Sequence, residues 1–95
     1  KSAVQEIKDM RQLSLDALKE LEDAYEKDGA ELLKTTAMNE QRIDDMSESL
    51  RENQLDRMRK GVCSADVGIL FSEMVTDFER IGDHAMNIAE EYNGI

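Results

Sequence analysis

Apolar residues recur at steps of three and four along most of this chain. An early stripe comprises Val4, Ile7, Met10, Leu13, Ala17, Leu21 and Ala24. A later one comprises Val67, Leu70, Phe71, Met74, Val75, Phe78, Ile81, Ala85, Ile88 and Tyr92. This spacing is the period of an amphipathic helix, and no segment carries a strand signal. The pattern therefore predicts an all-α protein.

Local start and stop signals divide the chain into three helices. Ser2 and Gln5 form a capping box, and Asp28 with Glu31 repeats that order after the first stripe. Gly61 gives a stop signal behind a run of basic residues, and Ser64 or Asp66 can cap the third helix. We expect helices over about 2–27, 30–60 and 65–93. Short connections then require an antiparallel three-helix bundle, with residues 1–95 as a single domain.

The charge balance narrows the functions that this chain can perform. Its 95 residues carry a net charge of −10, which disfavours binding to nucleic acid. From residue 61 onward there are seven acidic residues and one basic residue, Arg80, which suits either cation binding or a solvated acidic face. Cys63 is the only cysteine, so a reducing compartment fits. No apolar run is long enough for this segment to insert into a membrane, and the start at Lys1 suggests a piece of a longer protein.

The middle segment places acids where apolar residues are expected. Its predicted stripe runs through Leu33, Ala37, Ile43, Ser47, Leu50 and Met58. By helical projection, Glu40 and Asp44 fall inside that stripe. Burying an unpaired carboxylate is costly, so such groups are paired with a base, open to water or bound to a metal ion. All three interpretations remain open for this pair.

A second acidic pair lies further along the chain at the same spacing of four. Glu79 and Asp83 lie beside the last apolar stripe, with Gly82 between them and Glu90 further along the same flank. Two such pairs on neighbouring helices could hold metal ions between them, and Glu90 and Asn87 offer further oxygen ligands. Oxygen-only ligands select hard ions such as iron(III), manganese, magnesium or calcium. The alternative is a metal-free helical module for dimerisation or scaffolding.

An enzyme is not expected. Di-iron carboxylate enzymes also use helix bundles, but they need a Glu-x-x-His motif and four helices. Ile81 stands three residues before His84, the only histidine, so the motif is absent.

Residues 79–88 resemble the signature of the PhoU-like family. They read Glu-Arg-Ile-Gly-Asp-His-Ala-Met-Asn-Ile, and the preceding helix carries the matching Glu40, Ile43 and Asp44. The resemblance implies a three-helix repeat with multinuclear metal clusters at Glu40, Asp44, Glu79 and Asp83. In this family the metal is commonly iron or zinc; manganese also suits these ligands.

The same resemblance implies a role and partners. The family regulates phosphate uptake through contact with a transporter, in the cytoplasm. His84 and Glu90 make this chain most similar to the cytosolic C-terminal domain of bacterial sodium/phosphate cotransporter-type proteins, whose membrane domain would then be the partner. The free-standing regulators have two repeats, whereas this chain has one. We therefore also expect a homo-oligomer.

Overall fold

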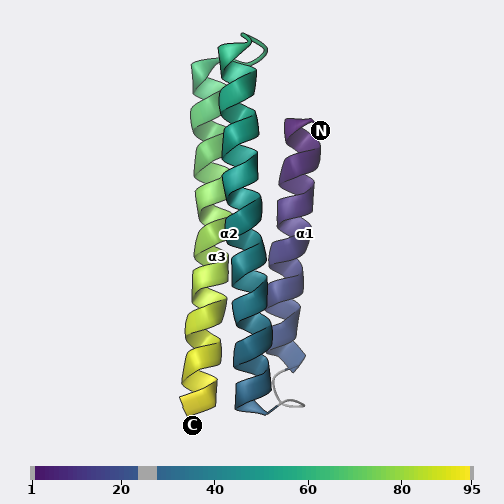
Figure 1. Ribbon diagram of the computed structural model, residues 1–95, viewed down its shortest axis with the longest axis vertical. Coiled ribbons are helices and arrows are strands. Elements are labelled where there is room, and N and C mark those ends of the chain that lie inside the picture. The colour runs from purple at the N-terminus through teal and green to yellow at the C-terminus, as the bar shows by residue number, and fades with distance from the viewer. Residues whose placement is uncertain (1, 24–27, 95) are drawn as a thin grey trace.

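The computed structural model describes residues 2–23 and 28–94, which form three long helices. They are α1 (Ala3–Glu22), α2 (Gly29–Arg59) and α3 (Ala65–Gly94). Helix α2 runs antiparallel to the other two, and all three lie side by side in a rod (Figure 1). The rod measures 51 × 18 × 16 Å. The predicted antiparallel bundle is confirmed, and α2 and α3 end within one residue of their expected bounds. Helix α1 ends at Glu22 with Asp23 as its C-cap, whereas its predicted end at about residue 27 lies outside the described residues.

Side-chain caps fix where each helix begins. The Ser2 hydroxyl accepts the Gln5 N–H at 3.2 Å, and the Asp28 carboxylate accepts the Glu31 N–H at 2.9 Å. Ser64, not Asp66, caps α3 by accepting the Val67 N–H at 3.3 Å. Each cap satisfies a backbone donor that would otherwise lack a partner.

A Schellman motif ends α2. Gly61 has a φ of 71°, in the left-handed region that glycine tolerates best. Its N–H bonds the Met58 carbonyl at 3.1 Å, and the Val62 N–H bonds the Arg57 carbonyl at 3.0 Å. These two bonds satisfy the last carbonyls of the helix and turn the chain towards α3.

The line of α2 that is buried between its two neighbours is rich in polar residues. It consists of Leu32, Thr36, Asn39, Ile43, Ser47, Leu50 and Gln54. The predicted stripe was therefore wrong in placing Glu40 and Asp44 inside it, because Glu40 is half-buried and Asp44 is exposed. Four of the seven buried residues are polar, so a search for apolar residues selected Leu33 and Ala37, which rotated the apparent stripe towards the acids.

The outer rim of the contact between α1 and α3 stays open to solvent, which the predicted stripes did not anticipate. Both helices pack against α2 and against each other, and the core includes Met10, Ile43 and Val75. The predicted core positions that are instead exposed are Val4, Val67, Leu70, Met74 and Ile88. They lie on the outer edges of α1 and α3, where no third helix covers them.

Candidate carboxylate site

A close approach of α2 and α3 positions the two acidic pairs. Gly82 is buried against Ile43, and a Cβ added to Gly82 would lie 3.1 Å from the Ile43 Cδ1 atom. That is tighter than ordinary van der Waals contact, so an alanine here would require the Ile43 side chain to shift by a few tenths of an ångström. Glu79 and Asp83 flank Gly82 in sequence, and Glu40 and Asp44 flank Ile43. The contact therefore brings the two pairs to the same level of the bundle.

Glu40 and Asp83 meet across the two helices. Burial raises the pKa of Glu40, and a hydrogen bond with Asp83 together with the negative charges of Asp83, Asp44 and Glu90 raises that pKa further. Crowded carboxylates favour the neutral form for these reasons. Glu40 therefore lies within electrostatic reach of Asp83, Asp44 and Glu90.

Asp44 completes the group on the α2 side. Partial desolvation raises the pKa of the exposed Asp44, and the negative charges of Glu79, Asp83 and Asp45 raise it further. Within residues 2–23 and 28–94, no basic side chain forms an ion pair with Glu40, Asp44 or Asp83. The interpretation that a neighbouring lysine or arginine pairs with these acids is thus not met inside the described part of the chain.

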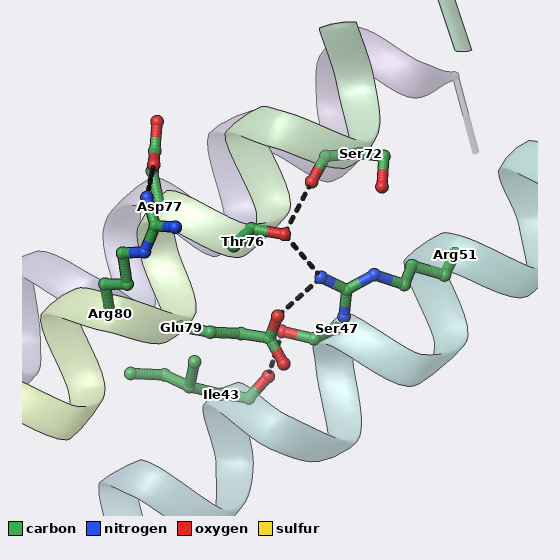
Figure 2. Close-up of polar contacts among 8 residues, drawn as sticks. All are labelled: Ile43, Ser47, Arg51, Ser72, Thr76, Asp77, Glu79 and Arg80. Carbon is green, nitrogen blue, oxygen red and sulfur yellow. Dashed lines mark hydrogen bonds and ion pairs between the residues drawn. The ribbon is translucent and has the colours of Figure 1, made fainter. Parts of the chain in front are cut away.

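Glu79 has a different partner. Its carboxylate accepts a hydrogen bond from the Arg51 guanidinium at 2.5 Å, and the same Nη2 atom donates to the Thr76 hydroxyl at 2.9 Å (Figure 2). Both side chains of the pair are about one-third exposed, with 36% for Arg51 and 29% for Glu79. Arg51 therefore draws one of the four predicted ligands towards itself.

The other two predicted ligands, Glu90 and Asn87, lie at the edge of this group of acids. Glu90 is exposed but close enough to raise the pKa of Glu40. Asn87 is exposed as well, and so is His84 beside it on the same helix. Among the described residues, no three histidine, cysteine or acidic side chains converge as a ready-made metal site.

The donor chemistry nevertheless suits a hard cation. Glu40, Asp44 and Asp83 offer only carboxylate oxygens, which hard ions prefer. Two of these side chains are exposed and one is half-buried, so they can rotate towards a shared ion. A bound ion would supply positive charge where like charges now repel. The group Glu40, Asp44, Glu79 and Asp83 is called the carboxylate site below.

Comparison with known proteins identifies the family. The sequence model described as "PhoU domain" matches residues 7–92. The chain belongs to the PhoU domain family. It is also 30% identical over 88 residues to the phosphate-specific transport system accessory protein PhoU homolog 1 of Thermotoga maritima. That alignment covers 93% of this chain but only 38% of the relative's length. No solved structure matches the chain.

The PhoU domain contains a second polar cluster that the sequence patterns did not reveal. Glu6 is only 1% exposed, and its carboxylate accepts bonds from Asn53 Nδ2 and Arg57 Nη2, each at 2.6 Å. Arg57 also bonds the Gln54 amide oxygen and lies 5.4 Å from the centre of the Phe71 ring. Arg57 belongs to the run of basic residues before Gly61, where cations interact favourably with the helix dipole. Glu6 could have been found, because it falls on the same helical line as Met10, Leu13 and Ala17.

The described part of the PhoU domain also bears on membrane contact. None of its helices combines the length and the apolar character needed to cross a bilayer.

The crowded acids predict a specific pH dependence. Because the pKa values of Glu40 and Asp44 are raised on folding, their contribution to stability is complete below the ordinary values of 4.5 and 3.8 and is lost as the pH rises through the higher folded values. In chelator at pH 7, a Glu40→Gln/Asp44→Asn variant should therefore melt at a higher temperature than the wild type. We expect a gain of about 0.2–0.5 kcal/mol for each like-charge pair relieved.

Thermal melts between pH 3.5 and 7 check this result. The gap between the two melting temperatures should narrow as the pH falls through the raised folded values and close below about 3.8, where both carboxyls are neutral in the folded and unfolded chains. A gap that is constant across the range would mean that the two acids do not repel each other.

Proposed function

We propose that this PhoU domain is a cation-binding accessory module associated with phosphate transport, and that its carboxylate site holds the ions. One observation carries the proposal. Acids from α2 and α3 crowd together closely enough to raise the pKa values of Glu40 and Asp44, without an ion pair to Glu40, Asp44 or Asp83 inside the described residues. An arrangement that costs stability is explained if a cation relieves it.

The nature of the ion follows from the donors. Iron or zinc is implied by the family resemblance, and manganese is compatible with the same ligands. Zinc sites usually include histidine or cysteine, whereas the carboxylate site offers oxygen only. Iron(III) and manganese therefore fit these side chains better than zinc does. Glu90 and Asn87 would join as additional ligands only if their side chains turned towards the groove.

The link to phosphate transport rests on the family and on the Thermotoga relative, which is named as a transport accessory protein. A cation held between Glu40 on α2 and Asp83 on α3 would tie the two helices together. It would thereby fix the shape that the bundle presents to a transporter or to its membrane domain, on the cytoplasmic side. A host chain of the sodium/phosphate cotransporter type is one form of this proposal. No catalytic step is assigned to the domain.

The proposal is tested by thermal melts of the purified chain in chelator and after adding manganese(II), iron or zinc. Binding to the folded state alone raises stability by about 2.7 kcal/mol when the free ion exceeds its dissociation constant a hundredfold. An unchanged melting temperature with every ion would instead favour the alternative, a metal-free scaffold or dimerisation module.

Self-association is a further part of this proposal, and α1 suggests the surface. Beside its core face, α1 carries a second line, Val4, Lys8, Arg11, Leu15, Leu18 and Glu22, at alternating steps of four and three. Its first half borders a groove of about 400 Å³ whose charged residues, Lys8 and Arg11, are both basic. Its second half exposes Leu15 and Leu18 next to Asp16 and Glu22.

These halves are complementary. In an antiparallel pair of α1 helices, the basic apolar groove of one copy receives the acidic leucine-bearing half of the other. A two-fold axis generates both contacts at once, as in most homodimers.

Charge reversal tests this dimer. At tens of micromolar, sedimentation equilibrium should show a dimer for the wild type and a monomer for Lys8→Glu/Arg11→Glu. A control variant, Lys34→Glu/Arg42→Glu, makes the same change in net charge on α2 and should remain dimeric. A monomeric wild type, or two variants that behave alike, would contradict the α1 interface.

A further inference from the structure

Arg51 is not part of the family signature, yet it contacts the carboxylate site. It lies two turns after Asp44 on α2, and its guanidinium reaches across to Glu79 on α3 (Figure 2). The Nη2 atom is shared between Glu79 and the Thr76 hydroxyl. Thr76 in turn donates to the Ser72 carbonyl at 3.0 Å, so the hydroxyl is held in place to accept from Arg51. The arginine is therefore oriented by two residues of α3.

The ion pair distinguishes Glu79 from the other three acids of the carboxylate site. Among the described residues, no base pairs with Glu40, Asp44 or Asp83, whereas Glu79 has a positive partner at 2.5 Å. The arginine thus neutralises one acid of the four and leaves the others unneutralised.

We infer that Arg51 is an internal competitor for the carboxylate site, which holds Glu79 when no cation is bound and must release it before Glu79 can become a ligand. This inference rests on the proposed cation binding. The guanidinium and a metal ion both require the same Glu79 oxygens, and two positive charges would repel across that carboxylate. Arg51 therefore sets the affinity of the site and couples ion binding to the contact between α2 and α3.

The release of Arg51 has a structural consequence. Once Glu79 turns towards a cation, the guanidinium of Arg51 keeps Thr76 as its partner. Its N–H groups that bonded Glu79 are then free to bind another acceptor. The groove beside it is lined by Leu55, Met58, Ile69 and Phe71, and has a volume of about 280 Å³. Cation binding at the carboxylate site would thereby change the charge that Arg51 presents at this groove.

The test is a titration with manganese(II), followed by the loss of the free-ion signal in electron paramagnetic resonance. Arg51→Gln can still donate a hydrogen bond but has no charge. Because a partly exposed ion pair is a modest competitor, we expect manganese to bind about three- to fivefold more tightly to Arg51→Gln than to the wild type. Arg51→Lys keeps the charge and should stay within about twofold of the wild type.

A matched control removes the same charge from the other side of α3. Arg80 follows Glu79 directly, but it pairs with Asp77 on the surface, away from Arg51 (Figure 2). Arg80→Gln should therefore leave the manganese affinity nearly unchanged. In the Glu79→Gln background, adding Arg51→Gln should have no effect, because the carboxylate for which the ions compete is gone. Circular dichroism establishes that each variant is folded.

The outcomes separate the two proposals. If the wild type binds manganese but Arg51→Gln binds equally or more weakly, Arg51 is no competitor and only this inference fails. If neither protein binds, and Glu40→Gln also changes nothing, the proposed cation site fails and takes the inference with it. Tight binding by Arg51→Gln alone would support competition in its strongest form.

Discussion

Replacing Arg57 by alanine should destabilise the domain by about 3–5 kcal/mol, the usual cost of leaving a buried carboxylate without its partner. Glu6 is 1% exposed and relies on Arg57 and Asn53 for its bonds. Removing the guanidinium leaves the charge of Glu6 in the core with one neutral donor. A domain of this size is stable by only about 5–15 kcal/mol, so the loss is a large share of the total. Urea unfolding followed by circular dichroism measures it.

A double variant supplies the control. Glu6→Leu/Arg57→Met replaces the pair by apolar side chains of similar length and should recover most of the loss, because no buried charge remains. If Arg57→Ala is as stable as the wild type, or if the double variant is worse than the single one, the pair does not hold α1 against α2.

The second large effect concerns the carboxylate site, where the same substitutions should raise stability without metal and lower it, relative to the wild type, with metal. In chelator, Glu40→Gln/Asp44→Asn should be slightly more stable than the wild type. With manganese(II) at a hundred times its dissociation constant, the wild type should gain about 2.7 kcal/mol, whereas the variant should gain almost nothing. For a domain of this length that gain corresponds to roughly 10–20 °C in melting temperature.

This reversal of the stability difference distinguishes a cation-binding domain from a metal-free scaffold. A scaffold without metal predicts that the substitutions are neutral or stabilising under both conditions. Asp66→Asn/Glu73→Gln, at exposed positions of α3, makes the same change in net charge and should respond to manganese as the wild type does. Equal gains for the wild type and the carboxylate variant would rule out Glu40 and Asp44 as ligands.

Local signals in the sequence were sufficient to predict the elements of this fold. Ser2, Asp28 and Ser64 cap helices through bonds to residues three positions later, and Gly61 ends α2 through its own backbone conformation. Such interactions depend on neighbours in the chain and are visible in the sequence. The capping box was only half right, because the Gln5 side chain donates to Asp9.

Packing between helices was harder to predict. The buried line of α2 passes through Thr36, Asn39, Ser47 and Gln54, which an apolar pattern cannot select. Ser47 is accommodated by donating to the Ile43 carbonyl at 2.7 Å, a bond within its own helix. Because these polar residues were not recognised as buried, the prediction chose Leu33 in place of Leu32 as the buried leucine.

The candidate site was predictable in part. The spacing of four in Glu40/Asp44 and in Glu79/Asp83 indicated two pairs, and the structure brings them together across Gly82 and Ile43. The partner of Glu79 was not predictable, because Arg51 lies 28 residues away and nothing in its local sequence singles it out. Long-range pairs of this kind depend on the register between α2 and α3.

The most direct measurement is elemental analysis of the purified chain by plasma mass spectrometry, before and after dialysis against chelator and again after reloading with iron, zinc or manganese. The carboxylate site predicts stoichiometric metal in the wild type and its loss in Glu40→Gln/Asp44→Asn. Metal-free wild type that takes up none of the three ions, or equal uptake by both proteins, would contradict cation binding at this site.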